Sequence, residues 1–163
     1  MIQETQLRLP CLLDRLVDFA PGSEEEAVRR RTVTLDEYRA AVLRDLRWLL
    51  NSACHLPWED IREFPHVARS VLNYGTRDLA GVTTDNLDGL DLERQYREAI
   101  INFEPRIVPD SLQVRLVHAD RSEVGRVGFE IKGHLWALPH PERIYFRTEI
   151  DLETGVCEIT GGT

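Results

Sequence analysis

The feature that most constrains the fold is a change of hydrophobic period at the tripeptide Glu104-Pro105-Arg106. Before it, apolar residues recur at helical spacing as far as Phe103, and after Pro109 they alternate with polar residues as in strands. Pro105 lacks a backbone N–H and disfavours helical geometry at Glu104, so a helix should end near Phe103. The chain is therefore predicted to join a helical half to a strand-rich half at one turn.

Glu104 and Arg106 lie two positions apart on what should be extended chain, so their side chains should point to the same side. The turn is therefore expected to display an acid and a planar guanidinium together, an arrangement that suits recognition better than burial. A second interpretation is that Arg106 braces the fold by bonding carbonyls at the helix end.

Two long amphipathic helices are predicted in the first half. The first begins at Thr34, which forms a capping box with Glu37. Its apolar face comprises Tyr38, Val42, Leu46, Leu49 and Leu50. Trp48 lies off this face, so it should contact the core, another element or a partner. The second helix runs from about Leu90 to Phe103. Its inward face comprises Leu92, Tyr96, Ala99, Ile100 and Phe103.

The segment from Phe64 to Gly75 predicts a short helix with Pro65 in its first turn and Gly75 as a left-handed C-cap. Val67, Val71 and Leu72 should face inward in that helix.

Alternating apolar residues in the second half predict strands around residues 112–118, 127–135, 144–150 and 156–159. Residues 119–125 should connect the first two strands as a hairpin loop. Helices followed by an antiparallel meander indicate an α+β fold, with the helices packed on one face of the sheet.

Length and composition fit one domain with a real core, because 163 residues are too few for two domains of ordinary size. No apolar run is long enough to cross a bilayer, and residues 1–6 lack the features of a signal peptide, which predicts a cytoplasmic protein. The net charge of −8 argues against nucleic acid as a partner.

The sequence predicts no metal site and no cofactor. Cys11, Cys54 and Cys157 include no Cys-x-x-Cys pair and suggest reduced thiols. His118, His134 and His140 lack the spacing of metal ligands. Common nucleotide-binding and hydrolase motifs are also absent from the sequence.

The N-terminal stretch carries leucines at helical spacing within Leu12-Leu13-Asp14-Arg15-Leu16. Ala20-Pro21-Gly22 and an acidic run follow it, so we expect a semi-detached segment over residues 1–26 and one domain over residues 27–163. The apolar stripe can dock on its own domain or be offered to another chain.

Four segments in order resemble the type VI secretion baseplate subunit TssE and its relative, the lysozyme-like baseplate-wedge protein of contractile phage tails. They are residues 10–16, 46–51, 64–75 and 104–106. The resemblance covers roughly residues 7–160, with Cys11 in place of an expected serine.

This resemblance implies a structural subunit of a cytoplasmic baseplate assembled near the inner membrane. TssE-like proteins join a wedge with TssF and TssG, and their fold is similar to the part of the sheath subunit that links successive rings. The resemblance implies sheath or wedge binding at Glu104, Pro105 and Arg106, and docking to wedge partners at Leu12, Leu13, Asp14, Arg15 and Leu16. An exposed sheet edge would pair with sheath strands and start sheath polymerisation.

Three alternatives remain open from the sequence. A contractile phage or phage-derived injection system would use the same fold, and a small adaptor would bind a regulator one to one. A peptidoglycan hydrolase would need a protonated carboxylic acid across a cleft from a second carboxylate such as Asp110 or Glu130. Arg106 beside Glu104 favours the ionised carboxylate, so we expect no enzyme.

Overall fold

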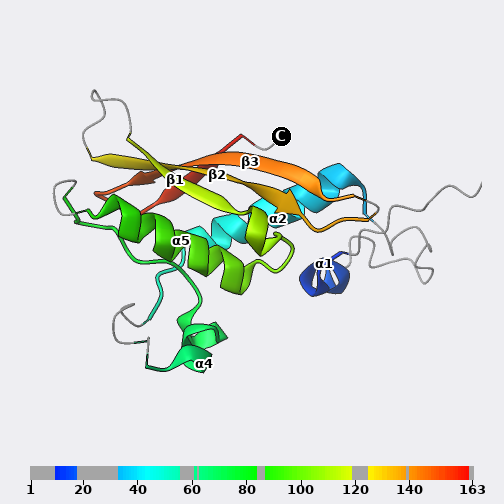
Figure 1. Cartoon of the computed structure of the whole chain (residues 1–163), viewed down its shortest axis with the longest axis horizontal. Helices are drawn as coiled ribbons and strands as arrows, with labels where there is room; N and C mark the ends of the chain where they lie inside the picture. The colour runs from blue at the N-terminus through cyan, green and yellow to red at the C-terminus, as the bar shows by residue number, and fades with distance from the viewer. Residues whose placement is uncertain are drawn as a thin grey trace, which may run out of the picture.

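The computed structural model describes residues 10–17, 33–55, 61, 63–83, 87–118, 125–138 and 140–161. Its helical elements are α1 (Leu12–Leu16), α2 (Leu35–Leu50), α4 (Pro65–Ala68), η2 (Val71–Asn73), α5 (Gly89–Phe103) and η4 (Pro109–Ser111). Its strands are β1 (Gln113–His118), β2 (Arg126–Leu135), β3 (Glu142–Asp151) and β4 (Cys157–Thr160). Helices α2 and α5 lie on the same side of the sheet (Figure 1). The predicted α+β class and the change of structure at Pro105 are confirmed.

The sheet is an antiparallel meander in the order β1-β2-β3-β4, as predicted. Strands β2 and β3 pair along their full length, from Arg126↔Asp151 to Leu135↔Glu142. Strand β4 is much shorter and pairs only with the second half of β3, from Arg147 to Ile150. Most of the loop expected at 119–125 lies outside the described residues.

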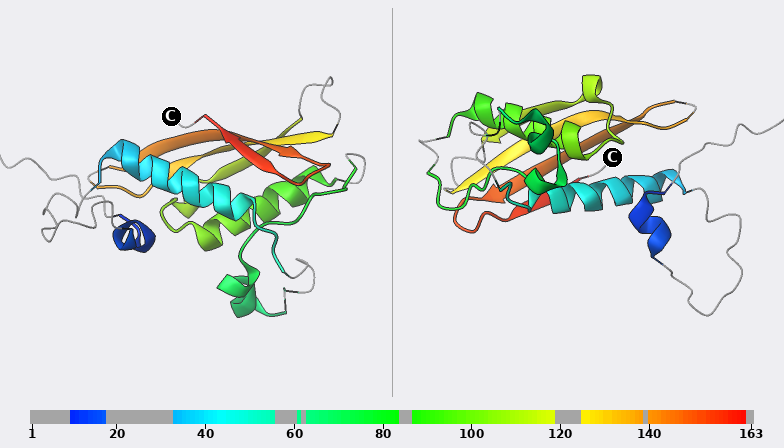
Figure 2. Two further views of the ribbon diagram at one scale, coloured as in Figure 1. Left: turned by 180° about the vertical axis from the view of Figure 1, so that it is seen from behind. Right: turned by 90° about the horizontal axis from the view of Figure 1, so that it is seen from below.

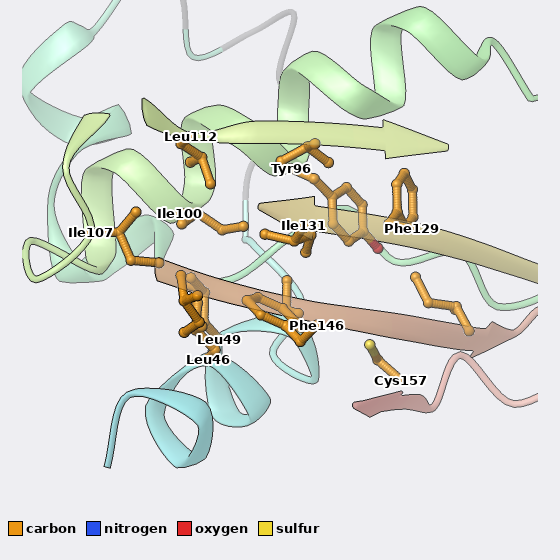
Figure 3. Close-up of a cluster of buried hydrophobic side chains, with 14 of the residues drawn as sticks. Leu46, Leu49, Tyr96, Ile100, Ile107, Leu112, Phe129, Ile131, Phe146 and Cys157 are labelled. Carbon is orange, nitrogen blue, oxygen red and sulfur yellow. The ribbon is translucent and has the colours of Figure 1, made fainter. Parts of the chain in front are cut away.

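The hydrophobic core lies between the two long helices and the inner face of the sheet. Figure 3 shows side chains of α2, α5 and the strands meeting there. Tyr96 of α5 stacks on Phe129 of β2 with ring centroids 4.5 Å apart. Along β3 the buried residues alternate with solvent-facing ones, so the sheet has an apolar inner face and a polar outer face. Burial of this apolar surface is the main force that stabilises the fold.

The two long helices form where their caps and apolar faces predict them. Thr34 accepts from the Glu37 N–H while the Glu37 carboxylate accepts from the Thr34 N–H, so the capping box is confirmed. All five residues predicted to form the α2 face are buried. Trp48, in contrast, is 49% exposed, so the interpretation that its side chain packs in the core was wrong. Leu49 and Leu50 take the inward positions of that turn, and Trp48 instead lies near the Arg44 guanidinium.

The segment from 64 to 75 differs from its prediction. Helix α4 has only four residues, and a separate 3₁₀ turn follows it, capped by Ser70. Val71 and Leu72 are 84% and 73% exposed, so the predicted inward packing of both was wrong.

Gly75 has a positive φ of 130° but does not cap a helix. It leads the chain into a bridge in which Thr76 exchanges backbone hydrogen bonds with Ser52 and Cys54 at 2.8 and 2.9 Å. A Cβ on Gly75 would lie 2.3 Å from the Ser52 carbonyl oxygen. Pairing with a distant segment therefore overrides the local helical pattern.

Within the described residues, no helix combines the length and the apolar character that a membrane span requires.

Candidate partner-binding site

The Glu104-Pro105-Arg106 turn directly follows α5, and the Glu104 N–H closes that helix by donating to the Ile100 carbonyl at 2.8 Å. Glu104 is only 3% exposed, so the expected surface display of its carboxylate was wrong. The physical reason is a bidentate ion pair: Arg106 Nε donates to Oε1 at 2.7 Å and Nη2 donates to Oε2 at 2.5 Å. Pro105 between them is exposed.

The Arg106 guanidinium also reaches α2, where its Nη2 donates to Asp45 Oδ2 at 2.6 Å. Burial alone would lower the pKa of Arg106, but its hydrogen bonds and ion pairs with Glu104 and Asp45 raise the pKa by more than burial lowers it. The net shift is upward, so the guanidinium stays charged. Its Nη1 is buried and has no hydrogen-bond partner in the described part of the chain. The Arg106 carbonyl accepts from Trp136 N at 2.7 Å, which fixes the turn to the end of β2.

Helix α1 forms as predicted but buries none of its residues. Leu12 and Leu16 are the most exposed, at 70% and 72%, and Leu13 is also exposed. Helix α1 contacts the domain through Arg44 of α2, whose Nη1 lies 2.5 Å from Asp14 Oδ1 and whose Nη2 donates to Cys11 Sγ at 3.7 Å. Figures 1 and 2 show α1 set apart from the sheet, below one end of α2. The apolar stripe of α1 is therefore not used by the domain's own core.

Cys11, where a serine was expected, donates from its Sγ to Asp14 Oδ2 at 2.9 Å. Burial raises the pKa of Asp14, but hydrogen bonds from Arg44 and Cys11 lower it by more, so the net shift is downward. The carboxylate is thus held ionised, as its pairing with Arg44 requires.

The two candidate regions are joined by a continuous series of ion pairs, which we call the ion-pair chain: Asp14, Arg44, Asp45, Arg106 and Glu104. The central link is on α2, where Arg44 Nη2 lies 2.7 Å from Asp45 Oδ1. Sequence reasoning missed Arg44 and Asp45. They are ordinary polar residues beside an apolar stripe, and nothing in their spacing reveals partners 30 and 61 positions away.

The model of the family described as baseplate wedge protein gp25 matches residues 36–140. The chain belongs to this family. The match contains α2 except its first residue, all of α5 and the Glu104-Pro105-Arg106 turn, whereas α1 lies before it. No curated protein and no solved structure matches the chain. A baseplate structural role follows from membership of this wedge protein family, as does interaction with other baseplate components.

Both outer strands of the wedge protein's sheet are partly covered by side chains from the helices. On β1, Glu93 Oε1 accepts from the Leu116 N–H at 2.7 Å. On β4, the Asn51 amide pairs with both backbone groups of Cys157, accepting from its N–H at 2.9 Å and donating to its carbonyl at 2.8 Å. These side chains take positions that another strand could otherwise use.

The first half of β3, residues 142–146, is different. The backbone groups of Cys157 point away from β3, toward Asn51, so Cys157 and Ile150 are a non-hydrogen-bonded pair. Hydrogen-bonded and non-hydrogen-bonded pairs alternate along an antiparallel ladder, so Glu149↔Glu158 and Arg147↔Thr160 are the hydrogen-bonded pairs of β3 and β4. The backbone groups of Arg143 and Tyr145 point toward the same side, beyond the end of β4. No described residue pairs with them there. We call residues 143–145 the open edge. Glu142, just before it, lies 3.8 Å from Arg39 Nη2 of α2.

The described residues contain no group of three or more His, Cys, Asp or Glu side chains that could hold a metal. Two of the three carboxylates considered for hydrolysis are paired with cations, and the third, Asp110, is exposed. Glu104 is bound by Arg106, and Glu130 on the outer sheet face accepts from Lys132, Arg147 and Tyr145. Neither carboxylate has the apolar surroundings that a general acid needs.

Proposed function

We propose that the protein is the TssE-like subunit of a type VI secretion baseplate, working in the cytoplasm as a structural part of the wedge with TssF and TssG. The observation that carries this proposal is membership of the baseplate wedge family together with the TssE-like segments at 10–16 and 104–106. The role is assembly and not catalysis.

The proposed mechanism is that the open edge receives a strand from a subunit of the first sheath ring. Backbone hydrogen bonds to an unpaired edge give affinity and set the register of the added chain. The wedge protein would thereby supply the first template for sheath polymerisation. The capped positions on β1 and β4 favour addition beside residues 143–145.

The two partner-binding regions take different parts in this proposal. Leu12, Leu13 and Leu16 offer exposed apolar area to TssF or TssG, while Asp14 holds α1 in place and Arg15 lies exposed at its end. In the other region, buried Glu104 and partly buried Arg106 hold the turn that presents exposed Pro105. Glu104 and Arg106 thus serve sheath or wedge binding mainly by shaping the turn.

The family match fits a contractile phage or phage-derived injection baseplate equally well. Gene neighbours separate the two settings, because only the secretion system encodes TssF, TssG and its own sheath subunits nearby.

The experiment that tests the proposal is co-expression of the chain with its cognate TssF, TssG and sheath subunits, followed by affinity capture and size-exclusion chromatography with mass determination. Stable co-elution with the wedge subunits and capture of sheath are the expected results. A folded protein that captures none of them would overturn the proposal.

A further inference from the structure

The outer face of the sheet carries its charges unevenly, although the whole chain has a net charge of −8. Three cations gather on neighbouring positions of β2 and β3, the strands nearest the open edge, around a single carboxylate, Glu130. They are Lys132, Arg143 and Arg147. This part of the face therefore has a formal charge of +2 with His134 neutral. The other end of β3 and β4 instead carries Glu149 opposite Glu158.

The single carboxylate in this group is already engaged. Glu130 accepts from Lys132 Nζ at 3.1 Å and from Arg147 Nη2 at 2.7 Å. Arg143 is exposed, lies opposite His134, and has no acidic partner in the described part of the chain. Its charge is thus available to a ligand.

Arg143 belongs to the open edge itself. A residue directly opposite it on an added strand would place its side chain on the same outer face, with Cβ atoms about 4.5–5.5 Å apart. The residue opposite Tyr145 would do the same, next to the Lys132 ammonium, which lies 5.3 Å from the Tyr145 ring centroid. Between these two positions, the residue opposite Ile144 would face inward, where Ile144 is buried.

From this geometry we infer that the segment received by the open edge has the pattern acidic, apolar, acidic, with both acidic side chains on the cationic outer face. The inference rests on the proposed strand addition and specifies the chemistry of the partner. Backbone pairing alone accepts almost any sequence, whereas the cationic face selects the segment and its register.

The test compares capture of cognate sheath subunits by the wild type, Arg143→Glu and Arg115→Glu. Arg115 is a matched control because it lies on the same face but on β1, about 14 Å from an added strand. Arg143→Glu should reduce capture about tenfold, since an attraction across the edge becomes a repulsion, while Arg115→Glu should leave it unchanged. Arg143→Gln should fall between, and equal melting temperatures would show that all variants fold.

Each other outcome has a definite meaning. Equal capture by Arg143→Glu and the wild type would overturn the acidic pattern while the proposed function stands. An equal loss with Arg115→Glu would overturn the placement at the open edge. Wild-type protein that captures no sheath subunit would overturn the proposed function, and this inference with it.

A second measurement uses Lys132, the one lysine in the sequence. A zero-length carbodiimide reagent joins amines to carboxylates in direct contact, so it should link Lys132 to an Asp or Glu of the bound sheath segment. Lys132→Arg should abolish that link and retain capture. Linkage of Lys132 to Glu130 alone, in a complex that still captures sheath, would contradict the inference.

Discussion

Helix α1 and the Glu104-Pro105-Arg106 turn use the same chemistry at opposite ends of the ion-pair chain, but their surroundings differ. The side chains of Glu104 and Arg106 are 4% and 16% exposed, whereas α1 buries no residue and contacts Arg44 of the domain through Asp14 and Cys11. A buried charge that loses its partner cannot be solvated, while a surface charge can. The turn is therefore part of the fold, and α1 is an attached segment whose apolar face remains available.

The strongest way to break this comparison is to remove the buried carboxylate. Glu104→Ala removes the bidentate partner of the largely buried Arg106 and leaves it only the contact with Asp45, so the free energy of unfolding should fall by about 3 kcal/mol, the lower end of the range for a broken buried pair. Urea denaturation followed by circular dichroism measures this. Glu158→Ala, at an exposed carboxylate on β4, is the control and should change stability little. A loss at Glu104 no larger than in the control would show that the turn does not brace the fold.

The next variant acts where the two regions meet. Asp45→Ala removes the carboxylate between Arg44 and Arg106, but Arg106 keeps Glu104 and Arg44 keeps Asp14. The loss of stability should therefore be smaller, about 1–3 kcal/mol by the same denaturation. A double-mutant cycle with Arg106→Ala should show coupling of the two sites. Strict additivity would mean that the contact between them contributes nothing.

The sequence predicted those parts of the fold that local pattern controls. The capping box at Thr34, the apolar stripes of both long helices and the strand alternation after Pro109 each follow from neighbouring residues. The segment 64–75 failed because the pairing of Thr76 with Ser52 and Cys54 ends the helical pattern early. Such pairing between distant segments has no local signature.

The candidate site was predictable in its members but not in its geometry. The sequence singled out the leucines around Asp14 and the Glu104-Pro105-Arg106 tripeptide, and their part in partner binding stays a prediction. The Glu104 carboxylate is buried, whereas α1 is exposed. Both regions are held by residues of α2: Arg44 contacts Asp14 of α1, and Asp45 contacts Arg106 of the turn. Whether residues 1–26 act as a docking segment stays a prediction, since 1–9 and 18–26 lie outside the described residues.

At the exposed end of the ion-pair chain, Asp14→Ala should leave global stability within about 1 kcal/mol of wild type, because partly exposed ion pairs contribute little. The local effect should be larger. Because only the longer contact of Cys11 with Arg44 would remain, α1 should open more often, and hydrogen exchange of peptides covering 10–17 should quicken. Asp36→Ala, in the first turn of α2, is the control. Unchanged exchange in α1 would mean that another contact holds it.

The smallest effect is a pH dependence confined to α1. Contacts with Arg44 and Cys11 lower the pKa of Asp14 below the ordinary value of 3.8. The docked α1 therefore binds fewer protons than α1 does when it is detached. The stabilisation should be fully present above the ordinary value and lost as the pH falls through the lowered one. Protection of 10–17, expressed relative to the unfolded peptide, should therefore persist at pH 5 and decline only below about pH 4.

Asp14→Asn should remove this dependence, because the amide does not titrate, and should leave α1 poorly protected throughout. The buried turn supplies the internal comparison. Protection at the C-terminal end of α5, where the Glu104 N–H is bonded to Ile100, should report the whole domain and not α1. Loss of protection in both regions at one pH would show that they open together, which would remove the distinction between an attached helix and a structural turn.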